Sequence, residues 1–292
     1  INDLRIHYVD VGPPGGQVIL LLHGEPSWSY LYRKMIPPLL EKGFRVIAPD
    51  LIGFGKSDKL VKQKDHSYKL HVSIMTKFVE LLDLSNINLF IQDWGGLIGL
   101  RVVHNLSERF SRIMAANTGF SKARGWKGYF GHTLFKLKIK RIGKVTGELL
   151  AETPNFLNWV AYSQTVNEFR IGEIIQGSTV SKLSEDIIKA YNAPFPDDSF
   201  KAGPRVMPML VTSQLRTNQK AWDITFRNWK KPFMTAFSDK DPITRGGHKS
   251  FERDIPGSIN IVHHIMENAG HFLQEDKGPE LAQLLIKFIE KT

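Results

Sequence analysis

Residues 87–100 read INLFIQDWGGLIGL, and the order of side chains in this stretch decides the fold. The apolar, β-rich run at 87–91 predicts a buried strand, and the apolar spacing at 97–103 predicts a helix. Between them lie Gln92, Asp93, Trp94 and a Gly-Gly pair. A strand, a tight turn and a helix follow one another without a spacer, so Asp93 stands at the apex of a sharp turn.

The same alternation of strands and helices continues on both sides of this unit. We expect strands at residues 6–9, 18–22, 45–48, 113–117, 233–237 and 259–265, and helices at 72–82 and 279–289. Strands separated by helices predict an α/β fold, in which a mostly parallel central sheet is covered by helices on both faces.

The alternation is interrupted between residues 117 and 233. Since it resumes afterwards, the gap predicts a helical cap inserted into one core and lying over the carboxyl ends of the strands, where open α/β sheets bind ligands. We therefore divide the chain into a first core part at 1–120, a cap at 121–213 and a second core part at 214–292.

Composition excludes several classes of protein. No apolar run is long enough to cross a bilayer, and the start of the chain lacks the pattern of a signal peptide. The absence of cysteine excludes disulfides and thiolate metal sites, and we expect no metal, no cofactor and a cytoplasmic location. Much of the net charge of +10 lies at residues 121–147, which hold eight Lys and Arg and no acid. We interpret this segment as a solvated face, and expect no nucleic acid or membrane partner.

The turn at Asp93 resembles the nucleophile elbow of α/β hydrolases, with Asp where Ser is usual. An alternative interpretation is that Asp93 caps the following helix. Asp241 and His271 follow the next two expected strands, in the order nucleophile, acid, base that this fold uses. Asp239 is the alternative acid. Taken together, the three positions predict a catalytic triad.

An Asp nucleophile limits the kinds of reaction that the site can catalyse. With a reference pKa of about 4, its carboxylate is ionised at neutral pH and can attack an sp3 carbon without a base. The product is an aspartyl ester, which water activated by His271 can hydrolyse. The charge that develops on the ester oxygen needs backbone N–H donors, and we expect these from Glu25 and Trp94.

Two reactions use such a triad, the hydrolysis of haloalkanes and the opening of epoxides, and they differ in the leaving group. A halide needs donors that stabilise an anion, and the indole N–H groups of Trp94, Trp126 and Trp159 are candidates. An epoxide oxygen needs a proton, and the candidate acids are three tyrosines of the expected cap: Tyr129, Tyr162 and Tyr191.

Four motifs make the chain similar to the haloalkane dehalogenases, specifically the branch with a paired-tryptophan halide site. They are HGEPSW at 23–28, QDWGG at 92–96, APFPD at 193–197 and GHFLQE at 270–275. The resemblance implies an α/β-hydrolase fold with a cap, and hydrolysis of a haloalkane to alcohol, halide and proton. It implies the following roles: nucleophile Asp93, base His271, acid Asp241, and halide ligands Trp94 and Trp159. Trp159 is preferred to Trp126 because FLNWVAYSQ at 156–164 matches the family's cap helix.

Two departures from the family pattern concern the cap: the stretch at 122–152 is longer, and Met207 stands where Phe is common. Three alternative functions stay open at this point. They are an epoxide hydrolase, a fluoroacetate dehalogenase that uses the basic cap segment to hold a carboxylate, and a non-catalytic binding protein on the same scaffold.

Overall fold

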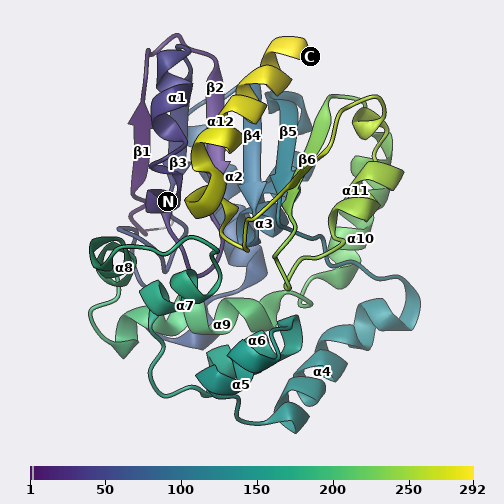
Figure 1. Cartoon of the computed structure of the whole chain (residues 1–292). Helices are drawn as coiled ribbons and strands as arrows, with labels where there is room; N and C mark the ends of the chain where they lie inside the picture. The colour runs from purple at the N-terminus through teal and green to yellow at the C-terminus, as the bar shows by residue number, and fades with distance from the viewer. Residues whose placement is uncertain (2) are drawn as a thin grey trace.

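A seven-stranded sheet forms the centre of the computed structural model, which describes residue 1 and residues 3–292 (Figure 1). The strands are β1 (Tyr8–Val11), β2 (Val18–Leu22), β3 (Arg45–Pro49), β4 (Ile87–Gln92), β5 (Phe110–Ala116), β6 (Phe233–Ser238) and β7 (His264–Met266). Their order in the sheet is β1-β3-β2-β4-β5-β6-β7; β1 runs antiparallel to β3 and the other neighbours are parallel. This confirms the expected mostly parallel sheet.

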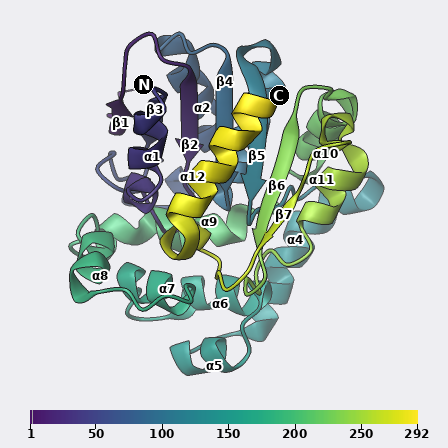
Figure 2. The same ribbon diagram turned by 45° about the horizontal axis from the view of Figure 1, so that its top comes forward.

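Both faces of the sheet are buried, as the continuous apolar runs of the strands require. Successive side chains of a strand point to opposite faces, so Ile19 and Leu21 of β2 join one core cluster while Leu20 and Leu22 join the other. The cluster that contains Ile19 and Leu21 is covered by α1 (Ile36–Glu41) and α12 (Leu273–Lys291), which cross the front of the sheet in Figure 2. The second is covered by α2 (Tyr68–Leu81), α3 (Trp94–Asn105), α10 (Leu215–Ile224) and α11 (His248–Asp254).

Helices interrupt the sheet between β5 and β6, and those preceding α10 lie beyond the carboxyl ends of the strands (Figures 1 and 2). They are α4 (Gly125–Ile142), α5 (Gly147–Glu152), α6 (Phe156–Thr165), α7 (Ile171–Gly177), α8 (Glu185–Asn192) and α9 (Ala202–Leu210). Across the described residues, no helix has both the length and the apolar character needed to cross a membrane.

The two edge strands differ from the expected boundaries. β1 covers Tyr8–Val11 rather than 6–9, because these four residues pair with residues 46–49 of β3. β7 covers only His264–Met266 rather than 259–265. The preceding apolar side chains do not pack, since Ile259 and Val262 are 65% and 71% exposed, and Asn260 has φ +67°, which is incompatible with a strand.

Three helices begin earlier than their apolar spacing indicates, and one of them is α3, which begins at Trp94 rather than at residue 97. α2 begins at Tyr68 because the Ser67 side chain accepts a hydrogen bond from the Leu70 N–H at 3.1 Å, which caps the helix. α12 begins at Leu273 and is kinked at Lys277, before Pro279. Proline has no N–H to offer the carbonyl four residues earlier, and that carbonyl, on Glu275, instead accepts a hydrogen bond from Lys34 Nζ at 2.6 Å.

Candidate active site

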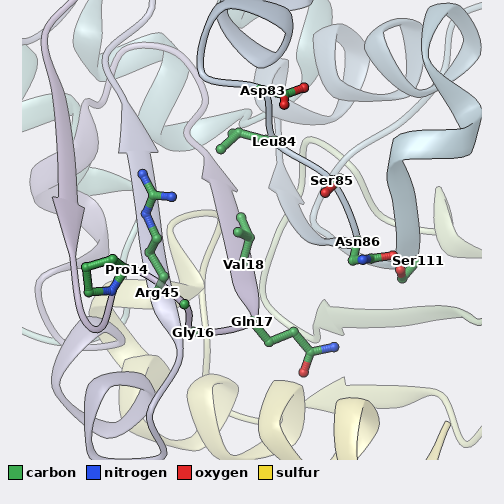
Figure 3. Close-up of a pocket in the computed structure, with 11 residues that line it drawn as sticks. Pro14, Gly16, Gln17, Val18, Arg45, Asp83, Leu84, Ser85, Asn86 and Ser111 are labelled. Atoms are coloured by element: carbon green, nitrogen blue, oxygen red, sulfur yellow. The ribbon is translucent and has the colours of Figure 1, made fainter.

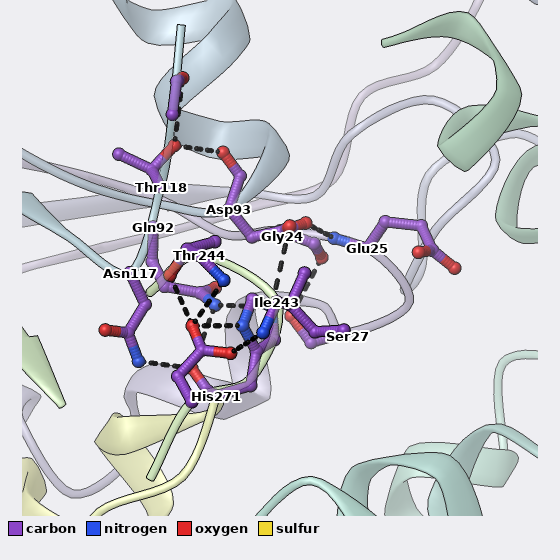
Figure 4. A network of polar contacts seen from close by, with 12 residues as sticks. Gly24, Glu25, Ser27, Gln92, Asp93, Asn117, Thr118, Ile243, Thr244 and His271 are labelled. Carbon is purple, nitrogen blue, oxygen red and sulfur yellow. Dashed lines mark hydrogen bonds and ion pairs between the residues drawn. The ribbon is translucent and has the colours of Figure 1, made fainter. Parts of the chain in front are cut away.

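Asp93 lies at the turn between β4 and α3, with φ +49° and ψ −124°. Such a backbone is costly for a residue other than glycine and is typical of functional turns. Although Asp93 holds the N-cap position of α3, its side chain accepts no capping hydrogen bond from this described helix. Its Oδ1 instead accepts a hydrogen bond from the backbone N–H of Glu25 at 2.8 Å (Figure 4). The carboxylate is therefore directed away from the helix that it precedes.

Two glycines permit this close packing of backbone around Asp93. A Cβ on Gly95 would lie 1.9 Å from the carbonyl oxygen of Leu22, so only glycine lets α3 approach the end of β2. A Cβ on Gly24 would lie 2.5 Å from Asp93 Oδ1. The loop after β2 therefore borders the nucleophile position directly.

His271 lies between two carboxylates. Its Nδ1 is 3.0 Å from Asp241 Oδ2, and its Nε2 is 3.5 Å from Asp93 Oδ2. The structure thus brings together the three side chains predicted to form a triad, from the ends of β4 and β6 and from the loop after β7. One imidazole can exchange protons near Asp93 while Asp241 fixes its orientation.

Asp241 is buried and hydrogen-bonded on both oxygens. Oδ1 accepts the Ile243 N–H at 2.7 Å, while Oδ2 accepts the N–H of Thr244 at 3.3 Å and also its hydroxyl. Burial opposes ionisation, but the charge of His271 and these donors outweigh it and lower the pKa of Asp241. The alternative acid, Asp239, lies apart from His271 and pairs with Lys240 at 3.5 Å.

The charge state of His271 follows from its neighbours. Burial alone would lower the pKa of the imidazole, but the charges and hydrogen bonds of Asp241 and Asp93 raise it to about 10. His271 is therefore protonated at neutral pH. Removal of the negative charge on Asp93 would take away part of this shift and release the proton more readily.

Two amide side chains that sequence reasoning missed hold the histidine loop. Gln92 Nε2 donates to the His271 carbonyl at 3.2 Å and lies 3.3 Å from its Nε2. Asn117 Nδ2 donates to the carbonyls of Gly270 and His271 at 2.9 and 3.0 Å (Figure 4). Their positions at the ends of adjacent parallel strands were the available signal, because such ends meet at one edge of the sheet.

Trp94 is the first residue of α3 and is buried beside Asp93. Its backbone N–H is one of those at a helix start that have no partner within the helix. The Trp94 ring packs edge-on against Tyr68, with centroids 5.1 Å apart. The Glu25 N–H donates to Asp93, and the role of the Glu25 and Trp94 N–H groups as an oxyanion hole stays a prediction.

A cavity of about 630 Å³ lies between the Asp93 edge of the sheet and the helices of the insertion. Its apolar lining is formed by Leu150, Ala151, Pro154, Phe156, Ile174, Val180, Pro208, Ile243 and Phe272. Asp93, His271, Trp94 and Trp159 also border it. A concave site with a mostly apolar lining, to which polar groups such as Asp93 and His271 contribute, is typical of sites for small apolar ligands.

The lining of the cavity shows which of the candidate tryptophans and tyrosines are placed to contact a ligand. Trp159 borders the cavity, whereas Trp126 is 62% exposed on α4 and does not line it. Among the three tyrosines considered, Tyr162 lines the cavity. Tyr129 is 61% exposed, and the Tyr191 hydroxyl donates to Glu275.

The side chain of Glu25 is a feature that sequence reasoning did not address. Its carboxyl is buried, and Oε1 has no hydrogen-bond partner among the described residues. Burial raises the pKa of Glu25 well above its usual range; the Asp93 charge adds to this shift, and a hydrogen bond from Trp159 opposes it. The environment of Glu25 therefore favours its neutral carboxyl form, beside one of the two indoles that border the cavity.

Besides the protonated His271, the cations that line the cavity are Arg170 and Lys240, and neither comes from the basic segment at 121–147. Arg170 pairs with Glu168, and Lys240 pairs with Asp239. The basic segment is therefore not placed to hold a substrate carboxylate in this cavity. Met207 is fully buried in α9 and is not part of the cavity wall.

A second hollow, of about 540 Å³, lies at the opposite edge of the sheet (Figure 3). Residues near the amino ends of the strands line it, among them Val18, Arg45, Asn86 and Ser111. It contains none of the residues predicted to carry chemistry.

Comparisons with known proteins agree with this architecture. The family described as alpha/beta hydrolase fold matches residues 17–278, so fold and site define an α/β hydrolase. A haloalkane dehalogenase of Psychrobacter cryohalolentis is 46% identical over 99% of this chain and 88% of its own length. One of Mycobacterium marinum is 40% identical over 98% of this chain and 89% of its own. The chain therefore belongs to the haloalkane dehalogenase family, whose members are hydrolases acting on carbon–halide bonds.

A solved structure gives the same result. The tetrameric haloalkane dehalogenase DpaA of Paraglaciecola agarilytica has a TM-score of 0.80 and 30% identity, covering 96% of this chain and 87% of that chain. The sequence-based prediction of the family is thus confirmed.

Proposed function

We propose that this chain hydrolyses haloalkanes by a two-step reaction on Asp93, inside the cavity covered by residues 121–213 acting as a cap. The observation that supports this best is the single imidazole of His271, 3.5 Å from Asp93 and 3.0 Å from Asp241. The apolar lining of the cavity supports an uncharged haloalkane as the substrate class.

In the first step, an oxygen of the Asp93 carboxylate attacks the carbon that bears the halogen. The new C–O bond forms as the carbon–halogen bond breaks, and the electron pair leaves with the halide. The indole N–H groups of Trp94 and Trp159 stabilise the halide. Trp159 must then turn its donor from Glu25 to the halide, and the raised pKa of Glu25 helps because a neutral acid competes weakly for that donor.

In the second step, the ester has removed the charge of Asp93, so the pKa of His271 falls and the imidazole loses its proton. His271 then takes a proton from water as that water attacks the ester carbonyl carbon. The N–H groups of Glu25 and Trp94 stabilise the resulting oxyanion. Collapse expels the alkoxide, which takes the proton from His271, and the proton of the Asp93 carboxyl then passes to His271, so that both side chains return to their resting charge states. The sum is haloalkane plus water giving alcohol, halide and one proton.

Halide release from a short bromoalkane tests the proposal, measured beside the opening of a simple epoxide. We expect halide release by the wild type and its loss in Asp93→Asn, because a neutral amide is a poor nucleophile. Circular dichroism should show that the variant is folded. Epoxide opening without halide release would instead favour an epoxide hydrolase with Tyr162 as the acid, since Tyr162 lines the cavity.

A further inference from the structure

Helix α4 has apolar side chains on two opposite faces. One face packs inward, with Phe135, Ile139 and Ile142 against α6 and neighbouring residues of the insertion. The other face carries Trp126, Phe130, Leu134 and Leu137, which are 62%, 60%, 48% and 58% exposed. These four residues recur at intervals of three or four, so they form one continuous outward stripe. Figure 1 shows α4 at the edge of the molecule, with nothing packed outside it.

Basic side chains border this stripe on both sides. Helical geometry places Lys127 and Lys138 along one flank and Lys136 and Lys140 along the other. Within the described chain, none of these four lysines pairs with an acidic side chain. The segment 121–147 holds no Asp or Glu that could compensate them. The outward face of α4 is therefore an apolar centre with a cationic border.

We propose that α4 docks on the surface of an anionic lipid bilayer. An amphipathic helix with Trp, Phe and Leu at its centre and Lys at its borders has the composition of helices that lie in the membrane interface. Trp and Phe enter the boundary between headgroups and acyl chains, while the lysines contact anionic headgroups. Binding in the plane of the interface is compatible with the absence, among the described helices, of one that could cross a membrane.

The charge of the stripe favours a bilayer over a second copy of this chain. In a twofold contact the same patch lies on both subunits, so two sets of unpaired lysines would face each other and repel. An anionic bilayer neutralises them. A bilayer also accepts the convex surface of a protruding helix without a matching groove.

Flotation with vesicles tests the docking. We expect the wild type to bind vesicles of equal parts phosphatidylcholine and phosphatidylglycerol at low salt. Binding to phosphatidylcholine alone should be weak, and high salt should weaken binding to the mixture. Lys136→Gln with Lys140→Gln should reduce the affinity roughly tenfold or more. Phe130→Gln with Leu137→Gln should do likewise, because it removes the inserted apolar groups.

A matched control uses exposed residues of the same kinds away from α4: Val262→Gln with Lys249→Gln should bind as the wild type does. Lipids with a spin label near the headgroup should quench tryptophan fluorescence in the wild type, and less so in Trp126→Phe. The proposal is overturned if the wild type does not bind anionic vesicles, or if both α4 variants bind as tightly as the wild type. It is also overturned if the wild type ignores vesicles while the α4 variants dissociate an oligomer by light scattering, since the stripe is then an interface between copies.

Discussion

The Gly270 N–H donates a hydrogen bond to Asp276 Oδ2 at 2.8 Å, across the residue that carries the imidazole. The same carboxylate accepts the Ser181 N–H at 2.7 Å and the Val180 N–H at 3.1 Å, both from the insertion. The His271 N–H, in turn, donates to the Ser178 carbonyl at 2.8 Å. Asp276 therefore joins the histidine loop to a segment that borders the cavity.

Asp276→Asn should weaken this connection, because an amide oxygen accepts N–H groups less strongly than a carboxylate does and its NH₂ group accepts none. We expect the free energy of unfolding to fall by ~1–3 kcal/mol. Hydrolysis of the ester, which needs a correctly placed His271, should slow more than halide release. Denaturant unfolding and single-turnover kinetics measure the two effects.

The control for Asp276→Asn is Glu280→Gln, which changes an exposed carboxylate of the same helix that pairs with Lys277. It should leave both rates unchanged. An Asp276→Asn variant with unchanged stability and equal slowing of both steps would contradict the assigned positioning role.

His271→Phe should separate the two chemical steps. The first displacement needs no base, so halide is released once per active site, and the ester on Asp93 then persists. Mass spectrometry of the variant after exposure to a bromoalkane should find the alkyl group on the peptide that contains Asp93. Absence of added mass, with the fold intact, is incompatible with a covalent ester.

The two steps should also respond differently to pH. With its pKa raised to about 10, His271 stays protonated at rest across neutral pH, and halide release in a single turnover should hardly vary there. Ester hydrolysis needs the neutral imidazole, so its rate should rise with pH and level off. The midpoint should lie below about 10, because the ester lacks the Asp93 charge. A hydrolysis rate that falls as pH rises would contradict the role of His271 as a base.

Trp159→Phe tests the halide site. Phenylalanine keeps most of the ring but removes the N–H donor, and loss of one donor to a developing anion costs ~3 kcal/mol by analogy with oxyanion holes. We expect bromide binding, followed by quenching of tryptophan fluorescence, and halide release to fall together. Trp126→Phe is the control, because Trp126 lies outside the cavity wall. If Trp126→Phe loses bromide binding and Trp159→Phe keeps it, Trp159 is not the ligand.

The ionisation of Glu275 should make the stability difference between the wild type and Glu275→Gln depend on pH. Burial raises its pKa, but hydrogen bonds from Arg33 and Tyr191 outweigh burial, so the folded pKa lies below the usual value. A lowered folded pKa stabilises the protein above the unfolded pKa of about 4.3, and this contribution is lost as pH falls further. Glu275→Gln should therefore cost ~3 kcal/mol at neutral pH and progressively less below about pH 4.

The control for Glu275 is Glu290→Gln, an exposed carboxylate 3.6 Å from Lys42, which should cost less than ~1 kcal/mol. Denaturant unfolding of the wild type and of both variants, at neutral pH and at a pH below about 4, measures these costs. A cost for Glu275→Gln that is equal at neutral and acidic pH would mean that ionisation of Glu275 contributes nothing.

The parts of the structure that the sequence predicted are those with strong local signals. The elbow at Asp93 combines an apolar strand, a glycine pair and helical spacing, and the observed β4 and α3 differ from the expected bounds by a few residues at most. The prediction of a strand at 259–265 was wrong over most of its length, because β-branched residues indicate a propensity for strand but not whether a neighbouring strand is there to pair with. Asn260 has a positive φ, and the chain pairs with β6 only from His264 onward.

The outward stripe of α4 could not be recognised from composition. Its apolar residues alternate with lysines along the chain, and which face packs inward depends on α6, which comes later in the sequence. The same holds for Glu25 and Asp276, whose side chains act on segments distant in sequence. Contacts of this kind require the tertiary structure.

Gly24 and Gly95 leave no room for even one methyl group beside the nucleophile. Mutagenesis at either position would displace Asp93 or α3 before it reshaped the cavity. The adaptable part of the wall is on the other side, where Leu150, Ile174 and Val180 extend from helices and a loop of the insertion. Engineering this enzyme toward bulkier substrates should therefore randomise those positions and leave the glycines fixed.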